Sequence, residues 1–194
     1  MTRKAKPTSA IVGVSDHGGW AVLMTVTRRG ALVDRRRVDL VDDELPRLPH
    51  HHDGQMLPLQ EAVALVARVQ ASAVRCARKR LDELAAAVPN EIVGIALRAC
   101  PSLPETVAER ITNYRAMCVA DWVMYRQALG DAATARGWSV HWYDSKRVFA
   151  DAASALKLPT IDALLDETRA AVGAPWQKDH KLAVAAAIAA AGTA

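Results

Sequence analysis

The chain has 194 residues, with 25 Lys and Arg against 21 Asp and Glu and a formal net charge of +4. This length fits one domain that can bury most of an apolar core. No apolar run approaches the roughly 20 residues that cross a bilayer, which excludes a membrane-spanning segment, while the mild positive charge permits nucleic-acid binding without requiring it.

Three strands are expected at the start of the chain. Apolar residues dominate 10–14, 20–26 and 31–41, and glycines stand at the two turns between them. Short apolar runs joined by glycine turns are typical of an antiparallel meander.

The flanking segments define the expected domain. Residues 1–9 are basic and are expected to form a disordered tail, and 10–194 to form a single domain. Residues 42–58 are rich in proline, histidine and acid and have no period, so we expect a long loop there. The three cysteines are scattered, without metal-binding spacing, which indicates reduced thiols and a cytoplasmic protein.

Helices and strands then alternate along the rest of the chain. Apolar residues recur at helical spacing through 59–88, and 105–136 is also helical, in one or two pieces. Residues 92–97 are uniformly apolar, as in a strand covered on both faces, and 138–143 alternate as a fifth strand. Helices are predicted for the remaining segments, which are 146–156, 160–172 and the alanine-rich run 182–191.

The predicted order is strand–strand–strand–helix–strand–helix–strand–helix. A helix that joins two neighbouring strands requires them to run parallel, with a right-handed crossover. The expected fold is therefore α/β, a three-layer α/β/α arrangement around a mixed five-stranded sheet.

This order resembles the ribonuclease H-like superfamily, and within it the RuvC-type Holliday-junction resolvases. The first strand ends at Asp16 and turns through Gly18-Gly19 into 20–22, which is similar to the opening of that family. Residues 125–148 are similar to its helix, glycine, fifth strand and basic segment. Residues 176–185 are similar to its last acidic residue and alanine-rich helix.

The resemblance implies metal-dependent phosphodiester hydrolysis, in which carboxylates hold two divalent ions, Mg²⁺ or Mn²⁺. Asp16 matches the first acidic position and Asp179 the last. The fourth strand should also end in an acid, but Arg98 stands there. An arginine repels Mg²⁺, and its guanidinium group can donate paired hydrogen bonds to a phosphate or to the carboxylate of Asp16.

Other residues near these positions could complete the set. His17 and His180 follow the two aspartates directly, and imidazole favours a transition metal or serves as a general base near neutral pH. Asp144, at the end of the fifth strand, could supply a further carboxylate. The predicted catalytic residues are Asp16, Asp179 and His180, and the predicted metal ligands are Asp16, His17, Asp179, His180 and Asp144.

Each of these residues also has a structural interpretation. Asp16 could cap a turn, Asp144 could cap the next helix, and Asp179 could stabilise a helix N-terminus. Arg98, Lys146 and Arg147 are predicted nucleic-acid contacts, with plain surface charge as the alternative. His50-His51-His52 lie in the predicted loop, where we expect no catalytic role.

Two functions follow from the sequence. The first is a metal-dependent nuclease acting on structured DNA or RNA. The second is a catalytically degenerate ribonuclease H-like module that binds nucleic acid or a protein partner. A homodimer through 105–136 is a further expectation from the resemblance. Pairing of Arg98 with Asp16 would favour the second function.

Overall fold

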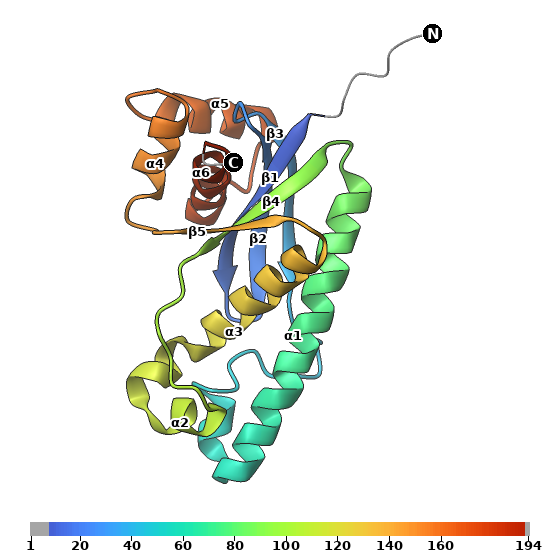
Figure 1. Cartoon of the computed structure of the whole chain (residues 1–194), viewed down its shortest axis with the longest axis vertical. Coiled ribbons are helices and arrows are strands. Elements are labelled where there is room, and N and C mark those ends of the chain that lie inside the picture. The colour runs from blue at the N-terminus through green and yellow to red at the C-terminus, as the bar shows by residue number, and fades with distance from the viewer. Residues whose placement is uncertain (1–7, 193–194) are drawn as a thin grey trace.

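In the computed structural model, which describes residues 8–192, a five-stranded sheet lies between two layers of helices (Figure 1). The strands are β1 (Ser9–His17), β2 (Trp20–Thr27), β3 (Leu32–Asp39), β4 (Glu91–Arg98) and β5 (Ser139–Tyr143). The helices are α1 (Leu59–Ala87), α2 (Val107–Thr112), α3 (Tyr114–Ala135), α4 (Val148–Ala155), α5 (Asp162–Val172) and α6 (Lys178–Ala191), with a short 3-10 helix η1 (Asp53–Met56). The predicted α/β fold class is confirmed, and the segment 105–136 forms two helices.

The strand order across the sheet is β3-β2-β1-β4-β5. β1, β2 and β3 pair antiparallel, whereas β4 lies parallel to β1 and β5 parallel to β4. The last residues of the three parallel strands, His17, Arg98 and Tyr143, therefore meet at one end of the sheet, which we name the carboxyl end of the sheet.

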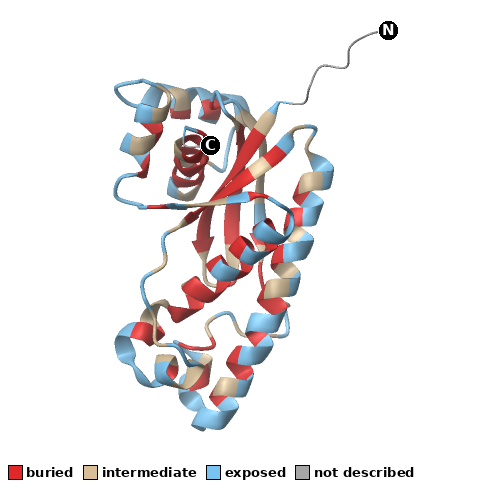
Figure 2. Cartoon of the chain, in the orientation of Figure 1, coloured by how far each residue is buried: buried red, intermediate tan, exposed pale blue. Residues whose placement is uncertain are grey.

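Two separate apolar cores cover the two faces of the sheet. On one face α1 and α3 pack on residues such as Val12 and Val14 of β1. On the other face α4, α5 and α6 pack on Ile11 and its neighbours. The alternation of side chains along β1 assigns its even and odd positions to different layers. Figure 2 shows that the central strands are almost wholly buried between these layers.

Helix α6 lies unusually close to β1. A Cβ atom on Gly13 would lie 1.8 Å from the backbone oxygen of Ala183, so only glycine fits at that point. The short side chains of the alanines let α6 approach the sheet closely, and nearly all of these alanines are buried. The helix begins at Lys178, so Asp179 and His180 belong to its first turn and do not precede it.

The first turns of α1 and α3 extend beyond the sheet and, with η1 and α2, form a distal lobe (Figure 1). This lobe has a small apolar core of its own, formed by Ala62, Val66 and Ile111. Its α2 begins with a capping box between Thr106 and Glu109. The predicted loop 42–58 leads into this lobe and contains η1.

Other sequence expectations concern the tail, the membrane and the cysteines. Most of the predicted tail 1–9 lies outside the described residues, and β1 already begins at Ser9. Within residues 8–192 no helix is both long and apolar enough to cross a membrane. Cys76, Cys100 and Cys118 are all free thiols.

Gly13→Ala should destabilise the fold because its methyl group would separate β1 from α6. We expect the free energy of unfolding to fall by about 3 kcal/mol, at the upper end of the cost of overpacking a core. Gly137→Ala is the matched control, because Gly137 has a φ of +77° but no atom within 4 Å of an added Cβ. Its cost should be about 1–2 kcal/mol of backbone strain alone. Urea unfolding of both variants checks this, and equal losses would show that the close approach is not limiting.

Candidate functional site

The end of β1 presents its side chains to opposite layers of the molecule. Ser15 and His17 point toward α6, where both contact Asp179. Asp16 lies between them in the sequence and points toward α3, where it pairs with Arg126. The expected pocket shared by the carboxyl groups of Asp16 and Asp179 is therefore not formed, because a strand alternates its side chains with a period of two residues.

On the α6 side, one carboxylate oxygen collects two contacts. The Ser15 hydroxyl donates to Oδ1 of Asp179 at 2.8 Å. Nε2 of His17 lies 3.1 Å from the same oxygen, within ion-pair distance, but it is not aligned as a hydrogen bond. The structure thus brings together two of the predicted residues, His17 and Asp179, and adds Ser15, which the sequence reasoning missed.

The His17 ring is held in place by an aromatic stack that ends in a guanidinium group. Its imidazole lies parallel to the indole of Trp20, with ring centroids 4.0 Å apart. The Arg37 guanidinium lies 4.4 Å from the indole centroid. Arg37 in turn pairs with Asp39, as does Arg47 from the following loop. This ladder fixes the orientation of His17 from the β1–β2 turn across to β3.

His180 is buried in the first turn of α6, and its hydrogen bond is that of a neutral imidazole. Its Nδ1 accepts the backbone N–H of Gln177 at 3.2 Å, which leaves the proton on Nε2. Its ring stacks on Trp176. Burial lowers the pKa of His180, the nearby charge of Arg35 lowers it further, and Asp179 opposes both effects. Arg35 also donates to three backbone oxygens, one at the last residue of α5 and two in the segment before α6.

Asp16 is a buried ion-pair partner on the opposite face. Nε of Arg126 donates to its Oδ2 at 2.8 Å, and the side chains of Arg126 and Asp16 are 7% and 0% exposed. Arg126 also donates to the backbone oxygen of Ala99, just beyond β4. Oδ1 of Asp16 is buried without a hydrogen-bond partner among the described residues. The counter-charge of Asp16 is therefore Arg126, and the pairing with Arg98 considered from the sequence does not occur.

Arg98 lies with Ser15 in a row across the strand ends. β1 and β4 pair at Gly13 and Ala96, and Ser15 and Arg98 follow two residues further along each strand. β4 and β5 pair at Arg98 and Tyr143. Nε of Arg98 is buried and makes no hydrogen bond in the described part of the chain. A guanidinium, and no carboxylate, therefore occupies the end of β4 on the α6 side.

Tyr143 closes this row. Its hydroxyl donates to the backbone oxygen of Val14 at 2.7 Å and ties β5 to β1 across β4. Burial raises the pKa of Tyr143 to about 12, so the phenol stays protonated at neutral pH. Its contribution to this end of the sheet is to fix the relative position of the three strands.

The predicted residues after β5 lie in an exposed turn. Oδ1 of Asp144 accepts the backbone N–H of Lys146 at 2.8 Å. Lys146 and Arg147 are exposed, and Arg147 makes a 3.4 Å ion pair with Asp151. Among the described residues no hydrogen bond or ion pair joins Asp144 to Asp179, so this carboxylate serves the turn.

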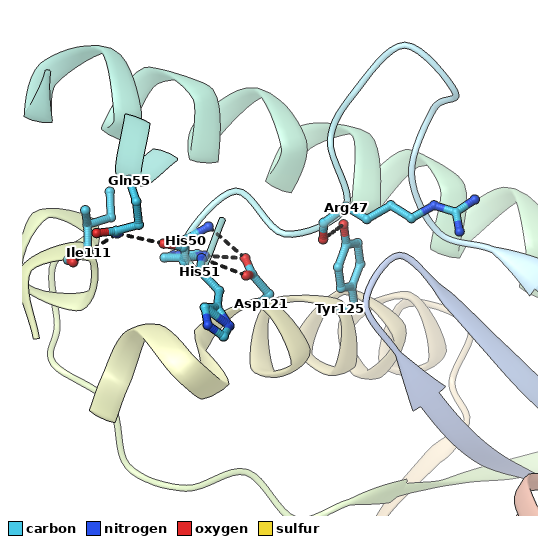
Figure 3. Close-up of polar contacts among 7 residues, drawn as sticks. All are labelled: Arg47, His50, His51, Gln55, Ile111, Asp121 and Tyr125. Carbon is cyan, nitrogen blue, oxygen red and sulfur yellow. Dashed lines mark hydrogen bonds and ion pairs between the residues drawn. The ribbon is translucent and has the colours of Figure 1, made fainter. Parts of the chain in front are cut away.

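His50 is a buried anchor of the loop that precedes α1. Oδ1 of Asp121 accepts both the backbone N–H of His50, at 3.0 Å, and the proton on its Nδ1, at 2.8 Å, and Oδ2 accepts the backbone N–H of His51 (Figure 3). Gln55 donates to the backbone oxygens of His50 and Ile111. Asp121 lies 71 residues from His50, so no local pattern could have revealed this pair.

The residues present do not fit two magnesium ions. Such ions need several carboxylate oxygens, with at least one carboxylate bridging them. The α6 side of the strand ends offers Asp179, the hydroxyl of Ser15 and the cation of Arg98, while Asp16 is held by Arg126. Within residues 8–192 no three His, Cys, Asp or Glu side chains gather closely enough to hold a metal ion.

The architecture is that of a ribonuclease H-like fold of the RuvC type. The structure is similar to T. thermophilus RuvC in complex with a Holliday junction substrate, with a TM-score of 0.53, 15% sequence identity, and 95% of this chain and 93% of that chain covered. A second Thermus thermophilus RuvC structure covers 94% of this chain and 93% of its own at 16% identity, with a TM-score of 0.43. At these identities the likeness concerns the fold alone.

No protein-family model matches the sequence, and no curated protein matches it.

Arg126→Met should remove the counter-charge of a carboxylate that stays buried. We expect the free energy of unfolding to fall by about 3–5 kcal/mol, and part of the loss to return when Asp16→Asn is added. Arg147→Met is the control, since it breaks an exposed pair and should cost about 1 kcal/mol or less. Urea unfolding measures all three, and equal losses in the two single variants would contradict a buried ion pair.

His180 should make the fold less stable in mild acid. The pKa of folded His180 lies below its ordinary value of 6.5, so the unfolded chain binds a proton first, and stability declines as the pH falls from neutral through 6.5. His180→Gln should make this decline shallower, although His141, whose pKa burial also lowers, still contributes. Urea unfolding across this pH range provides the measurement. An unchanged slope in His180→Gln would refute the assignment.

Proposed function

We propose that this chain is a ribonuclease H-fold module that binds the phosphate backbone of structured nucleic acid and lacks a two-metal hydrolytic site. The observation that carries the proposal is the exchange of charge at the carboxyl end of the sheet. Arg98 stands where an acidic metal ligand is expected, and the carboxylate of Asp16 is occupied by Arg126 on the other face. Of the two matched acids, Asp16 and Asp179, only Asp179 lies on the α6 side.

The surroundings of this end favour an anionic ligand. The basic side chains that surround it come from five parts of the chain and are Arg37, Arg47, Arg98, Lys146, Arg147, Lys178 and Lys181. The N-terminus of the 14-residue α6 also points its partial positive charge here. Asp39, Asp144, Asp151 and Asp179 offset part of this charge, and the balance remains positive. Neutralisation of backbone phosphates by Lys and Arg is the main source of such binding.

The comparison supports the class of ligand. The similar RuvC structure was solved with a Holliday junction substrate, and this chain covers nearly all of that fold. A module that keeps the shape, carries Arg98 in place of an acid and holds Asp16 in an ion pair would retain recognition of a branched duplex and lose its cleavage. The cytoplasmic location inferred from the reduced cysteines is consistent with such a ligand.

Metal-dependent hydrolysis of the same ligand is the second candidate, and one distance favours it. Nε2 of His17 and Oδ1 of Asp179 lie 3.1 Å apart without hydrogen-bond alignment, which suits two ligands of one ion with bonds of about 2.0–2.2 Å. An imidazole–carboxylate pair would select Zn²⁺ or Mn²⁺ over Mg²⁺. Two protein ligands hold an ion weakly, so this candidate ranks below binding alone.

The homodimer remains a proposal. Most of α3 is buried within the chain, so a partner helix would meet only the exposed residues of 105–136, among them Gln127 and Asp131. Two binding modules brought together in this way would engage two arms of one junction.

Arg98→Ala should weaken binding of a four-way DNA junction by about fivefold to tenfold and reduce the salt dependence by about one phosphate contact. Arg28→Ala is the matched control, because Arg28 is exposed in the β2–β3 turn at the opposite end of the sheet. Fluorescence anisotropy at several salt concentrations gives both quantities.

The same junction should remain uncut after incubation with Mg²⁺, Mn²⁺ or Zn²⁺. Cleavage that disappears in Asp179→Asn would replace the binding proposal with the hydrolytic one. Absence of both binding and cleavage, or equal losses in Arg98→Ala and Arg28→Ala, would refute nucleic-acid recognition at this end of the sheet.

A further inference from the structure

We propose that Trp142 and the Lys146–Arg147 turn form a contact site for an unpaired strand of nucleic acid at the edge of the sheet. The inference rests on the proposed function and adds the class of substrate, a duplex or junction that carries a single-stranded segment. The stacking surface is separate from the strand ends at which Arg98 lies.

Trp142 is unusually exposed for a large aromatic side chain. It is 49% exposed, whereas Trp138, four residues earlier, is 8% exposed. Among the tryptophans of residues 8–192 it alone is exposed, and the others are buried or half-buried. It lies on β5, the edge strand of the sheet, so no further strand covers it. Burial of an apolar core therefore does not explain this residue.

The indole is nevertheless held in one position. Its Cζ2 and Cη2 atoms lie 3.7 Å from the place that a Cβ on Gly130 would take, so this edge of the ring packs against α3. Val140, two residues earlier, points the same way and packs on the α1–α3 core. A fixed aromatic ring with an open surface loses little entropy when a planar ligand stacks on it.

Two cations follow the tryptophan at short range. Lys146 and Arg147 stand four and five residues after Trp142, in the turn that the Asp144 side chain holds through the backbone N–H of Lys146. Arg147 is 74% exposed and shares Asp151 at 3.4 Å, while the Lys146 ammonium makes no ion pair within the described residues. Basic groups beside an exposed aromatic ring are the combination that binds single strands, with phosphates on the cations and bases on the ring.

A hollow of about 850 Å³ lies on the opposite face of the same strand, between β5, α4 and α6. Tyr143 and the alanines of α6 line it, whereas the Trp142 indole packs on the α3 side of the sheet. The stacking face of Trp142 therefore lies outside this hollow, at the open edge of β5. In the turn that follows, Asp144 holds a backbone N–H and Asp151 pairs with Arg147, so among the described residues the unpaired ammonium of Lys146 is the first cation available to a phosphate.

The other aromatic side chains at the surface do not meet these conditions. Trp20 has His17 on one face and Arg37 stacked over its ring, so it offers no free face to a base. Tyr114 is 74% exposed, but it lies in the distal lobe, where Glu105 and Glu109 of the neighbouring sequence balance Arg110 and Arg115. Tyr114 therefore serves as the matched control for an exposed ring outside a basic site. Bases in an intact duplex are already stacked on each other, so the site selects unpaired nucleotides.

Trp142→Ala should weaken binding of an oligothymidylate of about 15 nucleotides by about tenfold, the effect of losing one stacked base. Affinity for a blunt duplex of the same length should change by less than about twofold. Trp142→Tyr, which keeps a ring, should retain most of the affinity, and Tyr114→Ala should behave as the unaltered protein. Lys146→Ala with Arg147→Ala should weaken oligothymidylate binding and reduce its salt dependence, even if Trp142→Ala folds poorly.

The outcomes separate this inference from the proposed function. Arg98-dependent junction binding together with oligothymidylate binding that is absent or unchanged by Trp142→Ala would overturn the stacking site alone. Equal losses for duplex and single strand, or for Trp142→Ala and Tyr114→Ala, would also overturn it. Failure to bind junction, duplex and oligothymidylate alike would refute both proposals.

Discussion

Helix α6 rests on β1 at a point where no side chain separates their backbones. Gly13 has no Cβ, and the backbone of α6 at Ala183 fills that space. This contact sets the height of the helix over the sheet and places its first turn above Ser15 and His17. The contacts of Asp179 follow from this placement, because the residues of β1 that can reach it are those on the same side of the strand as Gly13.

One arginine on each face sets the electrostatics of the carboxyl end of the sheet without changing the fold. On one face Arg126 neutralises Asp16 in a dry environment, where an unpaired carboxylate would be costly. On the other, Arg98 adds a positive charge at the point where the resemblance implied a negative one. A fold and the chemistry of its site are thus separable, since the packing depends on apolar layers and the chemistry on a few strand-end residues.

Much of this architecture could be read from the sequence. Glycine turns between short apolar runs gave the meander, and helical spacing gave α1 and the helices that follow, because these patterns are local. The alternation of side chains along β1 was also readable from the sequence. Val12 and Val14 are apolar and face the helices α1 and α3, and Asp16 lies on the same face two residues later. The expectation that Asp16 meets Asp179 rested on its charge and its place at the strand end, which do not determine the face.

The partners of the buried charges could not be predicted in this way. Arg126 lies 110 residues from Asp16, and Asp121 lies 71 residues from His50, so neither pair leaves a periodic signal. Their proximity depends on where α3 crosses the sheet, which is a property of the assembled layers. A single sequence contains the residues for such pairs but no local indication of which ones meet.

Helix α3 carries both of these pairs on a little more than one turn. Asp121 holds the backbone of the loop before α1, Tyr125 donates to the backbone oxygen of Arg47 in the same loop, and Arg126 holds Asp16 at the end of β1. Rotation of this helix about its axis would break all three contacts together. Helix α3 therefore couples the position of the distal lobe to that of β1. A ligand that displaces one of them would have to displace the other as well.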